Sequence, residues 1–173
     1  MSEEIPRHIS LDEVIVRGVF SNKVKKGKIL FDIFMPYPKG LSGFRLRYTS
    51  IESCSAKSQE IATEDRKYVG LLKIATEIIR IEANELFPPD LELIDASGNP
   101  IVFKPGERVV DVFGTPMIDD KNYYPDDKQV FTDSQGNPAH SDIRYKAEIE
   151  TFKPAPQFIR SIARHLLSKS EFV

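Results

Sequence analysis

Apolar and polar positions follow a strand-like pattern in the first third of the chain. Residues 13–20 (EVIVRGVF) and 28–35 (KILFDIFM) are rich in β-branched and aromatic side chains, and residues 44–49 (FRLRYT) alternate apolar with polar ones. A period of two is typical of strands, because successive side chains point to opposite faces. The polar, glycine-closed SNKVKKG between the first two runs predicts an antiparallel hairpin.

The pattern changes to helical spacing in the middle of the chain. Between Lys57 and Phe87, apolar residues recur at intervals of three, four and seven. Ser58 is a suitable N-cap for such a helix, and the pair at 88–89 (PP) would end it. The spacing therefore predicts one long central helix.

Strand patterns return after this segment. They cover residues 91–95 (LELID), 101–103 (IVF), 107–113 (ERVVDVF) and 142–152 (DIRYKAEIETF). Residues 156–169 then carry a wide apolar stripe with helical spacing, which predicts a C-terminal amphipathic helix. This order predicts an α+β fold whose mainly antiparallel sheet packs against the central and C-terminal helices. A length of 173 residues fits a single domain spanning 1–173.

Residues 114–141 show little periodicity, apart from KQVFT at 128–132, which predicts a short strand. A loop of this length in a compact domain is typical of a binding loop or lid. The segment is acidic and contains tyrosines, so it is a candidate partner-binding loop. Its candidate residues are Asp119, Asp120, Tyr123, Tyr124, Asp126 and Asp127.

Composition narrows the class of protein. The single cysteine, Cys54, excludes an internal disulfide and any multi-cysteine metal site. No apolar run approaches the roughly 20 residues of a membrane-spanning helix. The first ten residues lack the apolar core of a signal peptide. These features predict a cytoplasmic protein with no membrane association.

Two near-repeats, DASGNP (95–100) and DSQGNP (133–138), raise the question of ion binding. A calcium loop needs several more oxygen ligands at alternating positions and a glutamate about twelve residues from the first ligand. Neither copy has them. An Asp that caps a turn, followed by Gly-Asn, is instead typical of a tight turn. We interpret both segments as turns.

Charge is unevenly distributed, although the net charge is only −2. Lys and Arg are in excess in residues 1–50 and 151–173, whereas Asp and Glu are in excess between them. If the basic side chains converge, they would form a phosphate-binding surface for nucleic acid. The candidates are Lys23, Lys25, Lys26, Arg45, Arg47, Arg160 and Arg164.

Catalytic chemistry has little support in the sequence. The acids of the long loop, with His140, suggest a metal-dependent phosphodiesterase. However, the strand at 146–150 (KAEIE) lacks the lysine that a PD-(D/E)xK nuclease places two residues after its glutamate. Cys54 has no recognisable nucleophile motif, and a base would have to come from His8, His140 or His165. The sequence therefore assigns no catalytic residue, metal or cofactor.

The leading hypothesis is a non-catalytic subunit that interacts with a protein partner or with itself. It would present the acidic loop and the basic hairpin, whose opposite charges suit association. The first alternative is a nucleic-acid-associated protein that uses the basic hairpin and the C-terminal helix. The second is a metal-dependent phosphodiesterase or nuclease that uses the acidic loop.

Overall fold

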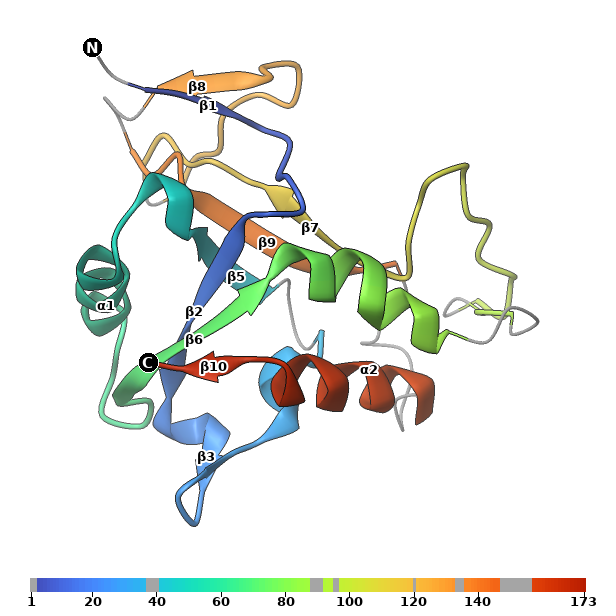
Figure 1. Ribbon diagram of the computed structural model, residues 1–173, viewed down its shortest axis with the longest axis horizontal. Coiled ribbons are helices and arrows are strands. Elements are labelled where there is room, and N and C mark those ends of the chain that lie inside the picture. The colour runs from blue at the N-terminus through green and yellow to red at the C-terminus, as the bar shows by residue number, and fades with distance from the viewer. Residues whose placement is uncertain are drawn as a thin grey trace.

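The computed structural model describes residues 3–36, 41–87, 92–94, 97–119, 121–132, 136–146 and 157–173. Its centre is a six-stranded sheet in which every neighbouring pair of strands is antiparallel (Figure 1). In sheet order the strands are β10 (Glu171–Phe172), β6 (Tyr68–Ala75), β2 (Val14–Phe20), β5 (Leu41–Arg45), β9 (His140–Tyr145) and β7 (Val110–Gly114).

Two small pairs of strands lie outside this sheet. β1 (Glu4–Pro6) pairs with β8 (Val130–Thr132), and β3 (Val24–Lys25) pairs with β4 (Lys28–Ile29). The β3–β4 turn places Lys26 at φ 51° and Gly27 at φ 73°. Positive φ at both central residues is the geometry that suits a tight two-residue hairpin.

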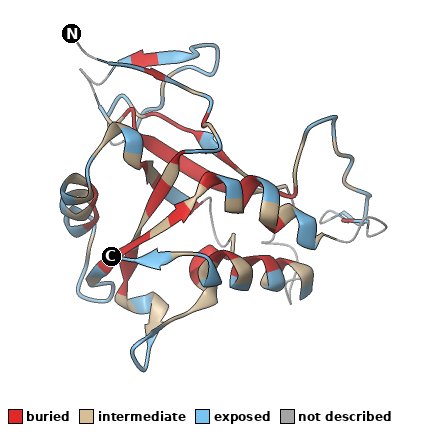
Figure 2. Cartoon of the chain, viewed as in Figure 1, coloured by how far each residue is buried: buried red, intermediate tan, exposed pale blue. Residues whose placement is uncertain are grey.

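Helices cover both faces of the sheet. α2 (Gln157–Ser168) lies beside an irregular helix made of a π turn (Ile78–Glu82) and a 3-10 turn (Ala83–Leu86) (Figure 1). These helices, with the 3-10 helix Phe31–Phe34, bury the main core against one face (Figure 2). α1 (Ile51–Glu60) covers β2 and β6 from the other face, where Cys54 packs on Val16 and Leu71. Two further 3-10 turns cover Ser21–Lys23 and Leu46–Tyr48.

The predicted mixture of helix with a largely antiparallel sheet is confirmed, but the long central helix at 57–87 is wrong. That segment contains the end of α1, the central strand β6 and the irregular helix. β6 is buried on both faces, since Leu71 contacts the α1 side and Leu72 and Ile74 the main core. A doubly buried strand has apolar residues at consecutive positions, which a period-based reading cannot distinguish from helix.

The predicted N-terminal hairpin is also wrong in its second strand. Within KILFDIFM only β4 is extended, and Phe31–Phe34 form a 3-10 helix instead of pairing with β2. The strand predicted at 44–49 begins earlier, at Leu41, and ends at Arg45. In place of the two strands predicted at 91–95 and 101–103, the described residues contain an isolated bridge between Ile94 and Pro100, and 101–103 form no strand.

The remaining elements are close to their predicted places. β7, β8 and β9 lie in the segments predicted at 107–113, 128–132 and 142–152, of which 147–152 is outside the described residues. α2 confirms the C-terminal helix within its described range. No helix in the described ranges is long and apolar enough to cross a membrane.

Candidate functional site

The candidate site begins where two central strands separate. β2 and β5 are paired only at Ile15–Arg45 and Val16–Phe44, whereas β5 continues to pair with β9 through Gly43, Ser42 and Leu41. The chain of β2 therefore diverges from β5 after Val16. The resulting gap opens into a pocket of about 1020 Å³, within the size range of small-molecule sites.

Arg17 fills the point of separation. Its Nη1 donates to the carbonyl oxygen of Ser42 at 2.7 Å, and its Nη2 donates to that of Ile33 at 3.2 Å. Its Nε is buried and has no hydrogen-bond partner among the described residues. Burial lowers the pKa of Arg17 to about 10, against the opposing attraction of Asp142. The pocket thus contains a desolvated cation that is incompletely hydrogen-bonded.

Gly43 leaves the space through which Arg17 reaches Ser42. A Cβ at this position would lie 2.8 Å from Cγ2 of Ile15, 3.1 Å from the carbonyl oxygen of Val16 and 3.4 Å from Cγ of Arg17. These neighbours on β2 could not all move away from the added atom, because one of them, the carbonyl oxygen of Val16, belongs to the backbone. A larger residue would therefore force β2 and Arg17 away from β5.

The upper wall of the pocket comes from α1 and the segment that follows it. Ser58 lies over Gly18, where an added Cβ would be 2.8 Å from its Oγ, so the glycine lets the helix approach the strand. Lys57 lies over the ring of Phe44, with Nζ 6.0 Å from the centroid. Arg66 stacks on Phe20 at 4.0 Å, which favours a cation–π contact.

The opposite rim comes from the second Asp-x-x-Gly-Asn-Pro turn. The backbone of Asn137 exchanges two hydrogen bonds with Met117, at 2.7 and 3.0 Å. Gly136 has φ +67° and packs directly against the same segment. Gly98 of the first copy has φ +81°, and both positive φ values agree with the interpretation of these segments as turns. The second turn thus also supplies pocket residues.

His140 lies at the start of β9, beside this turn. Its Nδ1 is 3.0 Å from the carbonyl oxygen of Thr115 and 2.9 Å from the hydroxyl of the same residue. A carbonyl can only accept, so Nδ1 carries the proton and Nε2 is left as an acceptor in the neutral ring. Burial lowers the pKa of His140, which favours this neutral form at pH 7.

The charges that line the pocket are unequally paired. Lys23 bonds to Asp32 at 3.1 Å, and both carboxylate oxygens of Asp119 accept hydrogen bonds within their own turn, from residues 121 and 122. Among the described residues no carboxylate forms a salt bridge with Arg17, Lys57 or Arg66. Of the described acidic residues that line the pocket, Glu60 alone forms no salt bridge or side-chain hydrogen bond. The pocket therefore has an excess of positive charge.

Serine, histidine and aspartate occur together here but do not form a catalytic relay. The hydroxyl of Ser42 donates to Asp142 at 3.3 Å, while Nδ1 of His140 is held by Thr115. A triad would need the carboxylate on Nδ1 and the hydroxyl on Nε2. Cys54 lies on the buried side of α1, and burial raises the pKa of its thiol to about 11, so the thiol stays protonated at neutral pH.

The predicted basic residues are not brought together. Arg45 is only 1% exposed and is bonded to Glu13, so it cannot contact an external phosphate. Arg47 forms an exposed pair with Asp12, and Lys23 lies at the pocket rim. Lys25 and Lys26 occupy the exposed β3–β4 turn. Arg160 and Arg164 lie on α2, where Arg164 stacks on Phe31 at 4.4 Å.

The predicted partner-binding loop is dispersed. Among its residues Asp119 faces the pocket, Asp126 lies 3.8 Å from Arg7, and Tyr124 packs on Phe131 at a centroid distance of 4.8 Å. Tyr123 and Asp127 are exposed, whereas Asp120 is outside the described residues. Where the chain is described, no group of three or more His, Cys, Asp or Glu side chains could hold a metal ion. The assembly role stays a prediction.

Several pocket residues were missed by the sequence analysis. Arg17 interrupts the apolar run of β2 and is followed by a glycine, and a charged residue inside a central strand was a usable signal. Arg66 and Lys57 have no such signal, because their segment was assigned to a long helix. Asn137 and His140 lay in the turn and loop that were singled out for other reasons.

A scan of protein-family models, a search of curated proteins and a search of solved structures each found no match to this chain.

Proposed function

We propose that this protein is a non-catalytic binding module whose pocket, between β2, β5, β9 and α1, holds a small anionic ligand. The observation that carries the proposal is Arg17. This arginine is partly buried on the pocket wall, has one donor without a partner, and forms no salt bridge with any described carboxylate.

The electrostatic cost of this arrangement supports a ligand. A cation removed from water without a carboxylate partner destabilises the fold, and its pKa is correspondingly lowered. Arg66 adds to this cost, since its charge further lowers the pKa of Arg17. A bound anion would neutralise the charge of both residues, which line the pocket. Groups whose environment is unfavourable in the free protein are typical of binding sites.

We assign no bond-making step to the pocket. His140 offers an acceptor, but no described hydroxyl or thiol is bonded to its Nε2, so the ring has no nucleophile to activate. The role that fits the described contacts is recognition: cations for an anion, Phe44 and Phe20 for apolar surface, and His140 with Asn137 for hydrogen bonds.

The test is isothermal titration calorimetry with inorganic pyrophosphate. Wild type and two variants, Arg17→Met and Arg108→Met, would be titrated in the same buffer. Arg108 is a matched control, because it lies before β7 and does not line the pocket. We expect binding to weaken at least about tenfold in Arg17→Met, as for loss of a charge-assisted hydrogen bond, and to be unchanged in the control. Equal affinities in both variants, or no binding to wild type, would refute the proposal.

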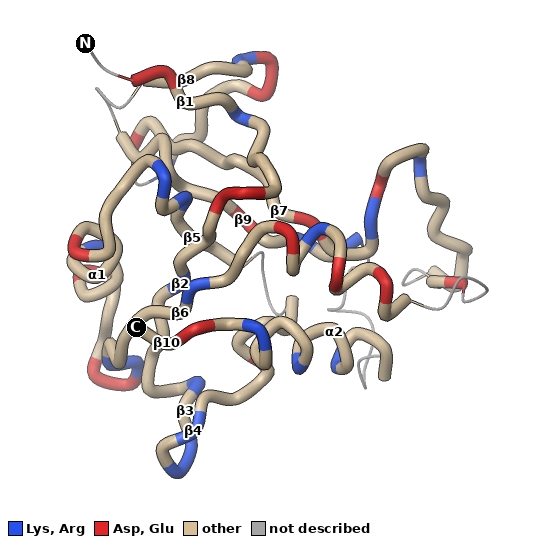
Figure 3. Tube along the Cα trace, viewed as in Figure 1, with Lys and Arg blue, Asp and Glu red and all other residues tan. Residues whose placement is uncertain are grey.

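A second candidate function is nucleic-acid binding through the basic residues of the β3–β4 turn and of α2. Figure 3 shows basic positions at the tip of this turn and along α2. Lys25, Lys26 and Arg164 are exposed there. With a fluorescent single-stranded oligonucleotide, we expect affinity to fall steeply with salt and to be lost on charge reversal in Lys25→Glu/Lys26→Glu. Absence of binding at about 50 mM salt would eliminate this candidate.

A further inference from the structure

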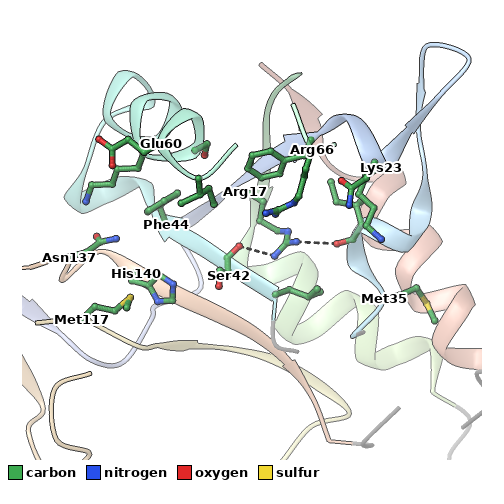
Figure 4. Close-up of a pocket in the computed structure, with 18 of the residues that line it drawn as sticks. Arg17, Lys23, Met35, Ser42, Phe44, Glu60, Arg66, Met117, Asn137 and His140 are labelled. Atoms are coloured by element: carbon green, nitrogen blue, oxygen red, sulfur yellow. Dashed lines mark hydrogen bonds between the residues drawn. The ribbon is translucent and has the colours of Figure 1, made fainter. Parts of the chain in front are cut away.

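The two ends of the pocket have different chemistry. Arg17, Arg66 and Lys23 lie toward one end, and Asn137, His140 and Met117 toward the other, with Phe44 and Ser42 between them (Figure 4). Three neighbouring strands set this separation, because Phe44 of β5 pairs with Val16 of β2 on one side and with His140 of β9 on the other. Two strand spacings amount to about 10 Å. An occupant of the whole pocket is therefore elongated and has two unlike ends.

The charge at the cationic end matches a phosphate monoester. Lys23 is neutralised by Asp32, whereas Arg17 and Arg66 form no salt bridge with a described carboxylate, and Arg17 has only the attraction of the more distant Asp142. A phosphate monoester carries a charge of about −1.5 to −2 at pH 7 and offers three acceptor oxygens. The guanidinium of Arg17 lines this part of the pocket, so its positive charge acts on such a group. A single carboxylate would leave one of the two cations unbalanced.

The other end is uncharged and has hydrogen-bonding groups of both kinds. Nε2 of the neutral His140 accepts, because Nδ1 is occupied by the carbonyl of Thr115. The side-chain amide of Asn137 both donates and accepts, while its backbone is fixed to Met117 by two hydrogen bonds. A rigid amide beside an imidazole acceptor suits the edge of a heterocyclic base, whose donors and acceptors are adjacent.

The surface between the two ends is aromatic. Phe44 is half-buried and packs against the buried cluster of Val16, Cys54 and Leu71, and the side chain of Lys57 lies above its ring, so a base stacks on this ring only after Lys57 moves aside. Stacking of a base on an aromatic side chain strengthens binding regardless of which base is bound. The volume of about 1020 Å³ accommodates a phosphate, a sugar and a base together.

From these three features we propose that the ligand is a mononucleotide, with its phosphate at Arg17 and Arg66 and its base against Phe44, Asn137 and His140. This inference rests on the proposed function, since it identifies the class of the anionic ligand in the same pocket. The inference adds that the base, at the end of the ligand far from the phosphate, is recognised by uncharged side chains.

The experiment compares whole and partial ligands by calorimetry. The probes are the four common nucleoside 5′-monophosphates, ribose 5-phosphate and inorganic pyrophosphate. The variants are Arg17→Met and Asn137→Ala, with Arg108→Met as the control. Asn137→Ala keeps the backbone hydrogen bonds to Met117, and a melting curve by circular dichroism verifies that each variant is folded.

We expect at least one nucleotide to bind wild type about tenfold more tightly than ribose 5-phosphate, which corresponds to one stacked base. Asn137→Ala should reduce this preference, because it removes hydrogen bonds to the edge of the base, while leaving the affinity for ribose 5-phosphate unchanged. Arg17→Met should weaken both ligands.

Two outcomes would overturn the inference in different ways. If ribose 5-phosphate or pyrophosphate binds through Arg17 as tightly as every nucleotide, the mononucleotide is wrong but the anion-binding function stands. If none of the probes binds wild type, the anion-binding function fails as well.

Discussion

Two arginines on adjacent central strands show how the same side chain can serve structure in one place and binding in another. Arg45 of β5 donates from Nε to Glu13 at 2.8 Å, from Nη2 to Glu13 at 2.9 Å and to His8 at 3.1 Å, and from Nη1 to the carbonyl oxygen of Pro6. It also stacks on Tyr48 at 4.7 Å. Arg17 of β2 has two bonds to backbone carbonyls, no acid partner among the described residues, and a buried Nε without an acceptor.

The two arginines differ in the partners of their guanidinium groups. The contacts of Arg45 come from the N-terminal segment, which it fastens to the sheet, so its hydrogen-bonding capacity is nearly exhausted within the fold. Arg17 lines the pocket, and its charge forms no salt bridge with a described carboxylate, so it is available to an anionic ligand. Its buried Nε without a partner is uncommon in native proteins.

The largest effect is expected for Arg45→Met. This change would leave the carboxylate of Glu13 buried and unpaired, at a cost of about 3–5 kcal/mol in the free energy of unfolding. Urea denaturation would measure it. Arg47→Met is the control, because Arg47 is an exposed arginine two residues away in an exposed ion pair with Asp12, and its loss should change stability little. Similar stabilities of the two variants would contradict the structural role of Arg45.

A smaller effect is expected at the glycine that admits Arg17. Gly43→Ala places a methyl group against Ile15 and the backbone carbonyl of Val16, and overpacking of this kind costs about 1–3 kcal/mol. Gly18→Ala is the comparison, since its nearest neighbours are the side chains of Ser58 and Phe20, which can move. Thermal unfolding should show the greater loss for Gly43→Ala. The reverse order would mean that the gap between β2 and β5 is not held open by Gly43.

Much of the fold could be predicted from the sequence, and the failures have one physical origin. α2 was found because one face is buried and the other exposed, which gives the helical period directly. β6 was missed because both of its faces are buried, so its apolar residues carry no period of two. The strand predicted over KILFDIFM was also wrong, because its residues Phe31–Phe34 form a 3-10 helix that packs under α2.

The site was less predictable, because it depends on how distant segments meet. Arg45 and Arg47 are equivalent in the sequence pattern, yet one is buried with Glu13 and the other is exposed. Arg17 and Arg66 are 49 positions apart and meet only because β2 and β6 are neighbours in the sheet. The turn at 133–138 was recognised as a turn, but its place at the pocket rim follows from the pairing of Met117 with Asn137.

Arg17→Met is expected to change stability by less than about 1 kcal/mol in either direction. The variant loses two hydrogen bonds to carbonyls, but it also removes a desolvated charge, and the two contributions oppose each other. Urea denaturation of both variants, Arg17→Met and Arg45→Met, is the most direct test of the difference between the two arginines. A loss as large as that of Arg45→Met would show that Arg17 is structural too, and the pocket would lose its principal ligand-binding group.

The smallest effect concerns pH and the neutral state of His140. Burial lowers its folded-state pKa below the unfolded value of 6.5, so the unfolded chain binds more protons as the pH falls toward and below 6.5. The contribution of His140 to the stability of wild type should therefore be full above about pH 6.5 and decrease as the pH falls below that value. His140→Gln, which can still donate to the carbonyl of Thr115, should show a weaker decrease, whereas the exposed control His8→Gln should match wild type. If His140→Gln loses as much stability as wild type on acidification, His140 is not held neutral, and the uncharged end of the pocket would instead become cationic in mildly acidic solution.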